Sequence, residues 1–449
     1  MRQFQHRQMT IMFFGLIALM LGSLTIMAED EIPKIDKKAK AEIIDSVTAT
    51  LNDNYVFPEV AQKMDEYIRQ QFKKGEYKEI TDPMAFTQKL TEDLREVCKD
   101  KHLWVRFEPD METVKDAPDS LTQEDIDQYV AEMKYDNFGF YKLERMEGNI
   151  GYVDMHGFND AAWGGPTAVA AMNFLANTDA IIFDMRKNGG GSPSMIQLIS
   201  SYFFEESQHL NSFYLRPEDT IKQFWTQAHV QGPKMIDMPL YILTSSYTFS
   251  AAEEFTYNLK SMERATIIGE TTGGGAHPVD FHNCPNIKIR IKVPTGRAIN
   301  PITGTNWEGV GVTPHIEVPE GEALETAHLE AMKYILKNTD NEQKKEMLNW
   351  VVGYKDGLKN PAEVGLDLLR KYAGQYGPRK ITLEDGILYY QREDRPQFKM
   401  IPLTEDTFIF EKLEHFRLKF ITDSSGQVSE VVGMYAGGRT DHSPRTSEN

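Results

Sequence analysis

Residues 240–262 have the sequence LYILTSSYTFSAAEEFTYNLKSM and contain an apolar run, a polar loop and a helical pattern, in that order. The run Leu240–Thr244 is short and apolar, which favours a buried strand. Ala251–Met262 has the spacing of a helix, and Ser250 stands immediately before it. A strand followed by a loop and a helix is the unit that builds parallel sheets with crossover helices.

The same unit recurs on both sides of this stretch. Strands are predicted at 150–155, 180–184 and 266–269, and helices near 161–176 and 195–204. Strands that alternate with helices predict an α/β fold with a βαβ core and a mainly parallel sheet. Further on, residues 287–293 alternate isoleucine or valine with lysine or arginine, which predicts a strand with one solvent-exposed face, near an edge of the sheet or the surface.

The flanking regions have other patterns. Residues 35–97 have helical spacing, and the acidic stretch that follows has one predicted helix at 123–133. Residues 323–348 are again helical, and alternating residues around Asp385-Gly386 predict a hairpin. We therefore expect a signal peptide (1–28), an N-terminal helical domain (29–107), a connector (108–148), a catalytic domain (149–320), a helical linker (321–352), a β-rich domain (353–436) and a disordered tail (437–449).

The N-terminus has the pattern of an export signal. Two arginines and a histidine within the first seven residues precede an apolar run from Ile11 to Met27, and acidic residues begin only at Glu29. Cleavage is expected after Ala28. Because Ile26 stands where a small residue is preferred, an uncleaved membrane anchor remains the alternative. The sequence thus predicts a periplasmic or extracellular protein, with 1–28 as a tether if it is retained.

Composition excludes several classes of protein. Hydrophobic residues make up 41% and charged residues 26%, values of a globular chain rather than a disordered, collagen-like or many-span membrane protein. The net charge of −18 opposes binding to nucleic acid, so no such partner is expected. Cys98 and Cys284 do not make a disulfide framework, although the two could pair in an oxidising compartment.

Ser250 is the first candidate for chemistry. At the start of a helix, the positive end of the helix dipole would stabilise the alkoxide of Ser250, and the Ala251 N–H could donate to a developing oxyanion. The alternative is that Ser250 is only an N-cap residue.

A second loop carries three glycines, in the sequence Asp184-Met185-Arg186-Lys187-Asn188-Gly189-Gly190-Gly191-Ser192. Glycines allow backbone N–H groups to approach a ligand oxygen closely. A phosphate loop would need Lys-Ser or Lys-Thr after the glycines, and Ser192-Pro193 provides neither. An oxyanion hole with one N–H from Gly190 or Gly191 fits better, and a flexible connection is the alternative.

Several motifs together resemble peptidase family S41, which includes tail-specific proteases, tricorn core proteases and interphotoreceptor retinoid-binding proteins. They are Gly151-Tyr152, Asp184-Met185-Arg186 before the three glycines, Ser250-Ala251-Ala252-Glu253, and Gly269-Glu270-Thr271-Thr272-Gly273-Gly274, within residues 35–318. The resemblance implies a crotonase/ClpP-like βαβ spiral core with an N-terminal helical domain. It also implies a serine peptidase that acts on polypeptides.

The resemblance also indicates the base. The family's C-terminal processing branch uses a lysine in the loop that here spans 273–277, and this loop has no lysine. The tricorn and retinoid-binding branch uses a histidine in an Asp-x-His segment, which Asp100-Lys101-His102 matches, and a late acid, which Glu308 matches. The implied catalytic set is Ser250, His102 and Glu308. Lys101 replaces the family's serine and could hold Glu308.

Other readings stay open. His277 in the glycine loop is the alternative base, and no histidine spacing indicates a metal, so neither a metal nor a cofactor is expected. The stretch between His102 and Ile150 is too short for a PDZ domain. The alternative function is a non-catalytic protein that binds an apolar, retinoid-like ligand. The C-terminal aromatic residues, in a module similar to the small β domain of exported hydrolases, are expected to form a core.

Overall fold

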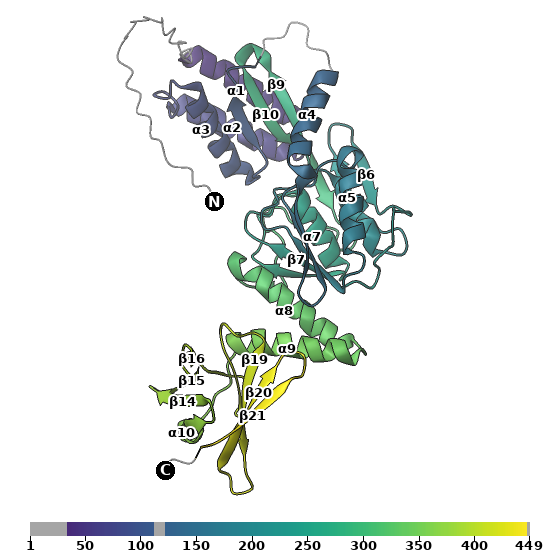
Figure 1. Cartoon of the computed structure of the whole chain (residues 1–449). Coiled ribbons are helices and arrows are strands. Elements are labelled where there is room, and N and C mark those ends of the chain that lie inside the picture. The colour runs from purple at the N-terminus through teal and green to yellow at the C-terminus, as the bar shows by residue number, and fades with distance from the viewer. Residues whose placement is uncertain (1–33, 112–121, 447–449) are drawn as a thin grey trace, which may run out of the picture.

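The computed structural model describes residues 34–111 and 122–446. The predicted signal segment 1–28 lies outside the described residues, as does part of the predicted connector. Within the described part, no helix is long and apolar enough to cross a membrane. Figure 1 shows the N-terminal helices, the central sheet and the C-terminal strands following one another along the molecule.

The centre of the molecule is a six-stranded sheet with the order β12-β8-β7-β4-β3-β2. Neighbouring strands from β3 to β12 pair in parallel, and β2 adds an antiparallel edge. This confirms the mainly parallel sheet, but β2 lies in the segment predicted to be a connector. The strands are β2 (Phe140–Met146), β3 (Ile150–Met155), β4 (Ala180–Asp184), β7 (Leu240–Thr244), β8 (Ala265–Gly269) and β12 (Ile316–Glu317).

Helices cover both faces of this sheet because its strand residues alternate between two cores. Phe183 and Ile242 pack on α5 (Ala161–Leu175), α6 (Pro193–Ser200) and α7 (Ala251–Ser261), whereas Ile182 and Leu243 pack on α8 (Glu320–Asn338). Residues 323–348 are largely helical, as predicted, but they belong to two helices. Helix α8 ends at Asn338, and Asn341 caps a second helix, α9 (Glu342–Lys359), by accepting from the Lys344 N–H.

The N-terminal region is helical, as predicted, but it shares a sheet with a later part of the chain. Helices α1 (Lys37–Asn54), α2 (Pro58–Lys74) and α3 (Pro83–Cys98) pack with the sheet β1-β10-β9, formed by β1 (Trp104–Phe107), β10 (Ile289–Pro294) and β9 (Val279–Cys284). The strand expected near an edge is therefore the central one, with Ile289, Ile291 and Val293 in the helical core. Register pairs Trp104 with Lys292, which brings the segment before β1 next to the loop before β9.

The remaining elements flank the central sheet. Helix α4 (Gln123–Tyr135) agrees with the helix predicted at 123–133. A small sheet with the order β11-β5-β6 has no counterpart in the sequence prediction; it comprises β5 (His209–Leu215), β6 (Thr220–Trp225) and β11 (Gly296–Ile299). Cys98 and Cys284 are both free thiols.

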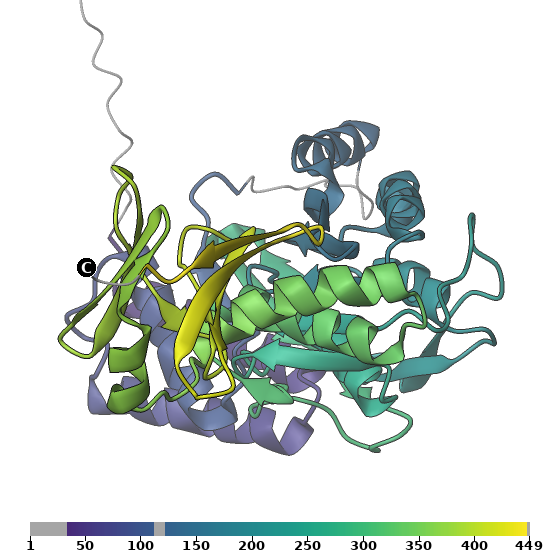
Figure 2. The same cartoon turned by 60° about the horizontal axis from the view of Figure 1, so that its bottom comes forward.

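The C-terminal part contains α10 (Leu366–Tyr372) and two antiparallel sheets. The first comprises β13 (Gly374–Tyr376), β14 (Arg379–Glu384), β15 (Ile387–Arg392) and β16 (Phe398–Lys399), and the second β17 (Ile401–Pro402), β18 (Thr407–Ile409), β19 (Phe416–Thr422), β20 (Val428–Tyr435) and β21 (Thr440–Pro444). Asp385-Gly386 forms the predicted turn between β14 and β15. The disorder predicted from 437 is wrong for β21, which pairs with β20. Aromatic side chains, including Phe408 and Phe420, form the core of this C-terminal part. Figure 2 shows the C-terminal strands in front of the central six-stranded sheet.

Candidate active site

Ser250 has a strained backbone at the point where the chain turns from β7 into α7. Its φ is +54° and its ψ is −120°, a region that non-glycine residues rarely adopt and that costs about 1–3 kcal/mol. The turn is fixed to the neighbouring glycine loop, because Thr248 Oγ1 donates to the Met185 carbonyl at 2.8 Å and the Phe249 N–H to the Asn188 carbonyl at 3.1 Å. Such a strand-to-helix turn presents a serine oxygen at the edge of the sheet.

The loop 184–192, which carries three glycines, lies directly against Ser250. Gly190 has a φ of +109° and Gly191 a φ of +142°. A Cβ on Gly190 would lie 2.8 Å from the Ser250 Cβ and 2.9 Å from the Ala251 nitrogen, so this packing requires glycine. Gly190 donates its N–H to Asn188 Oδ1 at 2.9 Å, whereas the Ala251 N–H is the first of α7 and has no acceptor within the helix. The three oxyanion candidates are therefore neighbours, with the Gly190 N–H engaged in the loop itself.

We expect Gly190→Ala to lower kcat/KM by about 100-fold or more, because a misplacement of about 1 Å at a reacting group has an effect of that size. The new Cβ would also be strained by the positive φ. Peptide cleavage kinetics of the purified variant measure this. Gly189→Ala is the matched control, because its Cβ would meet only the Tyr247 hydroxyl at 3.7 Å. Equal activity of the two variants would show that the contact between Gly190 and Ser250 has no role in catalysis.

His102 lies beside the turn that carries Ser250. Its side chain is 3% exposed, and its ring packs against Phe249 with the ring centroids 4.6 Å apart. Burial lowers the pKa of His102 to about 4, so the imidazole is neutral at pH 7 and able to accept a proton. Its Nδ1 atom is buried and has no hydrogen-bond partner in the described chain. No hydrogen bond joins the His102 ring to Ser250 Oγ among the described residues.

The buried Asp100 and His277 form a network with the partly buried Glu308 next to His102. His277 Nδ1 lies 2.6 Å from Asp100 Oδ2 and 3.6 Å from Glu308 Oε2. Asp100 Oδ1 accepts the backbone N–H of His102 at 2.9 Å and lies 3.9 Å from His102 Nδ1. Glu308 Oε2 accepts the Ala276 N–H at 2.5 Å. The histidine implied as the base and the alternative histidine thus belong to one network, connected through Asp100.

The charges of this network are set by burial and by the neighbouring groups. Burial raises the pKa of Glu308 to about 7, and the Asp100 carboxylate adds to that effect. Burial lowers the pKa of His277, but its hydrogen bond to Asp100 and the negative charges of Asp100 and Glu308 together outweigh burial, so the net pKa of His277 is raised. Conversely, the pKa of Asp100 is lowered despite its burial, because His277 stabilises the carboxylate. These directions favour an ion pair between His277 and Asp100.

The same three side chains lie close enough together to hold one cation. The hydrogen bond of 2.6 Å between His277 and Asp100 accounts for their closeness without a cation.

Lys101 does not hold Glu308. Its Nζ donates to the Gly273 carbonyl at 2.5 Å, so this lysine binds the loop 273–277 instead. The expectation that Lys101 could contact Glu308 is therefore wrong.

Glu253 is a further residue of the site, to which the sequence analysis gives no role. Its buried carboxylate accepts from Thr272 Oγ1 at 2.5 Å, from the N–H groups of Gly274 at 2.6 Å and Gly275 at 2.8 Å, and from the Ser250 N–H at 2.9 Å. Glu253 thereby joins the turn that carries Ser250 to the loop that carries His277. A glutamate three residues after a helix-capping serine is the sequence signal that could have found it.

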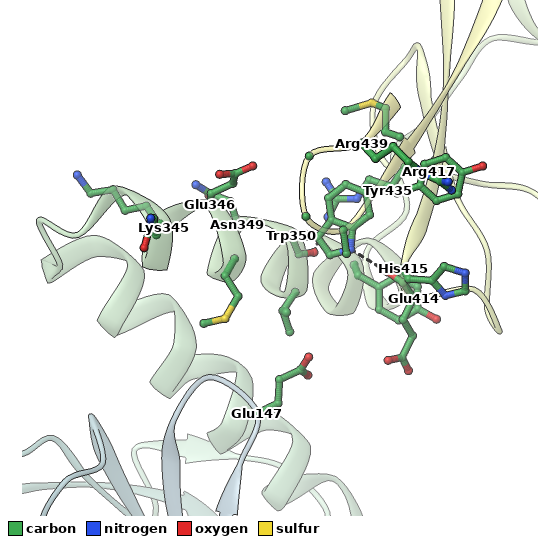
Figure 3. A pocket seen from close by; sticks show the side chains of 18 of the residues that line it. Glu147, Lys345, Glu346, Asn349, Trp350, Glu414, His415, Arg417, Tyr435 and Arg439 are labelled. Atoms are coloured by element: carbon green, nitrogen blue, oxygen red, sulfur yellow. Dashed lines mark hydrogen bonds between the residues drawn. The ribbon is translucent and has the colours of Figure 1, made fainter. Parts of the chain in front are cut away.

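A cavity of about 1030 Å³ lies away from this site, between α9 and the C-terminal strands. Figure 3 shows Trp350, Arg417, Tyr435 and Arg439 on its walls, and Glu147 from the turn between β2 and β3 facing them. None of the candidate catalytic residues lines it.

The chain is similar to known protein families and to solved structures. Residues 149–318 match peptidase family S41, and residues 27–138 match the N-terminal domain of peptidase S41 in eukaryotic IRBP. The two stretches together cover more than half of the chain. Similar structures include one from Parabacteroides merdae described as a candidate peptidase, with 18% identity, a TM-score of 0.47 and coverage of 66% of this chain and 97% of that chain.

Two further similar structures are those of proteases. The photosystem II D1 C-terminal processing protease has 14% identity and a TM-score of 0.40, and the match covers 63% of this chain and 93% of that chain. The tricorn protease has 13% identity and a TM-score of 0.45, with 67% of this chain and 37% of that chain covered.

Proposed function

The chain belongs to peptidase family S41 and is a serine-type peptidase, and on this basis we propose that it cuts extended polypeptides with Ser250 as the nucleophile. His102 is the general base and Glu308 the acid of the same set. The strained backbone of Ser250, held against Gly190 and beside the neutral His102, is the observation that carries the proposal.

The proposed reaction proceeds in two halves. Ser250 Oγ attacks the carbonyl carbon of the scissile bond while its proton passes to His102, and the oxyanion forms beside the Ala251 N–H. The imidazolium then gives the proton to the leaving amine, the C–N bond breaks, and an acyl ester remains on Ser250. Water, deprotonated by His102, hydrolyses that ester, and the proton returns to Ser250 Oγ.

We further propose that the protein is exported by residues 1–28, to the periplasm or the cell exterior, or held at the membrane by them. The charged start, the apolar run and the late onset of acidic residues support this. N-terminal sequencing of the protein purified from the native host would test it, because a mature chain that begins at Glu29 is the expected result. A chain that keeps Met1 and fractionates with membranes would indicate the anchor.

Digestion of a peptide and unfolded-protein library, read by mass spectrometry, tests the proposed peptidase. The full chain should cleave, and His102→Ala should not. If His277→Ala alone abolished cleavage, the base would be His277 instead. No cleavage by the parent chain would contradict the proposal and favour the apolar-ligand binding function, for which retinol binding would be the next assay.

Activity should persist well below the ordinary histidine range. The base must be neutral, so kcat/KM falls as pH drops through the pKa of His102, which burial lowers to about 4. The unperturbed value of about 6.5 would instead predict a loss of activity already at pH 6. A pH profile of kcat/KM between 3.5 and 8, with circular dichroism to confirm folding at each pH, measures the midpoint. A midpoint near 7 would indicate Glu308 as the controlling group.

A further inference from the structure

We propose that Asp100, rather than Glu308, is the carboxylate that orients the base His102. His277 holds Asp100 in place and connects Glu308 to the base. Asp100 and His277 are thus positioning residues. This inference rests on the proposed function, and it assigns roles within that site.

The position of Asp100 is the first argument. It is 1% exposed, and its Oδ1 atom accepts the backbone N–H of His102 at 2.9 Å. The same Oδ1 lies 3.9 Å from His102 Nδ1, a buried atom without another partner. A histidine base needs an acceptor for its Nδ1 proton, and catalytic hydrogen bonds are often long before substrate binds. A shift of about 1 Å would give an ordinary hydrogen bond between these two atoms.

The position of Glu308 is the second argument. In the described part of the chain, no hydrogen bond or ion pair joins Glu308 to His102. Glu308 Oε2 accepts the Ala276 N–H and lies 3.6 Å from His277 Nδ1, and Oε1 has no partner. The acid implied by the family resemblance therefore faces the second histidine, and any influence on the base passes through His277 and Asp100.

His277 is well placed to fix Asp100. Its Nδ1 donates to Asp100 Oδ2 at 2.6 Å, so each carboxylate oxygen of Asp100 has its own donor. The ring of His277 is 6% exposed and packs edge-on against Phe57, with the ring centroids 5.6 Å apart. These contacts leave the Asp100 carboxylate little freedom to rotate away from His102.

Asp100 and His277 carry opposite charges, so their removal should shift the pKa of His102 in opposite directions, which makes the proposal testable. After burial, the negative charge of Asp100 is the largest influence, and it raises the pKa of His102. Positive charge on His277 lowers that pKa, as do Lys292 on β10 and Arg95 on α3. Removal of the Asp100 charge should therefore lower the pKa of His102, and removal of His277 should raise it.

The experiment compares Asp100→Asn and His277→Gln in the full chain. Asp100→Asn should lower kcat/KM by about 10²- to 10⁴-fold, as expected when a histidine base loses its orienting carboxylate, and move the acid limb to lower pH. His277→Gln should lower it by about 10- to 100-fold, by analogy with partners that orient metal-bound histidines, and move the limb to higher pH. Loss of packing alone would reduce activity without these opposite shifts.

The matched control is Asp93→Asn. Asp93 on α3 is also buried and accepts from the Tyr77 hydroxyl at 2.8 Å, but it belongs to the helical core. This variant should keep the parental kcat/KM and acid limb. If Asp100→Asn behaved the same way while Ser250→Ala was inactive, the peptidase function would stand and the role of Asp100 would be overturned.

A measurement on the parent chain tests the proposal without any variant or activity. A ¹⁵N spectrum of histidine-labelled protein at pH 7 should show neutral His102 with its proton on Nδ1, the tautomer that an Asp100 acceptor requires. A proton on Nε2 would overturn the proposal even if the variants did not fold. A parent chain that shows the Nδ1 tautomer but no cleavage would contradict the proposed function and leave the orientation of His102 by Asp100 supported.

Discussion

Ser250→Ala is expected to lower kcat/KM for peptide cleavage by about 10⁴- to 10⁶-fold, the range found when a serine protease loses its nucleophile. The acyl ester cannot form without Oγ, and the remaining activity would come from binding and from the Ala251 N–H alone. The loss should fall on kcat, because the substitution removes one oxygen and leaves the surface for the polypeptide unchanged. Initial rates with a peptide found in the library digestion measure it.

The variant should remain folded, which makes the result interpretable. Alanine in place of a helix-capping serine costs about 1 kcal/mol. Ser246→Ala is the matched control, since Ser246 is exposed in the same loop and its side chain makes no hydrogen bond among the described residues. A Ser250→Ala enzyme that cleaves like Ser246→Ala would show that Ser250 is only a cap.

Local features of the sequence were sufficient to predict much of the catalytic core. Strands β3, β4 and β7 begin and end at the predicted residues, because short apolar runs bounded by turn residues carry a local signal. The tripeptide Thr339-Asp340-Asn341 interrupts a helical pattern with two good capping residues, and this local signal, which accounts for the break between α8 and α9, was not used in the prediction.

The central position of β10 could not be read from its own residues. The alternation of side chains predicted one polar, solvent-facing side of the strand, and that side exists. The pairing with β1 on one side and β9 on the other, however, depends on segments far away in the chain. Edge and central strands differ in the partners of the backbone, and the alternation of side chains along one strand does not specify those partners.

The candidate site shows the same division between local and distant information. Ser250 and the three glycines stand in local strand-to-helix patterns and were found from them. The contact between His277 and Asp100 joins residues 177 positions apart, and it exists because β1 pairs with β10. Family resemblance supplied His102 and Glu308, but not the fact that Asp100 lies between the two histidines.

Glu253→Gln is expected to destabilise the protein by about 2–5 kcal/mol and to lower kcat/KM by at least about 100-fold. Each carboxylate oxygen accepts from two donors: Oε1 from Thr272 and Gly274, and Oε2 from Gly275 and Ser250. An amide has only one acceptor oxygen. Either orientation of the glutamine therefore directs its NH₂ group at a buried glycine N–H, and that N–H stays unsatisfied. Urea unfolding and peptide kinetics measure the two effects.

Glu254→Gln is the control that separates this network from a general effect of burial. Glu254 follows in the same helix and is 3% exposed, but burial raises its pKa to about 7, so its carboxyl is already partly protonated near neutral pH. The side chains of Asn211 and Asn258 favour its charged form, and the Asn211 amide and Asn258 Nδ2 have no hydrogen-bond partner among the described residues, so they can turn to meet an amide. The free energy of unfolding of Glu254→Gln should therefore stay close to that of the parent. If both variants lost the same free energy, the four donors of Glu253 would add nothing beyond burial, and the loop that carries His277 would have to be held by its other contacts.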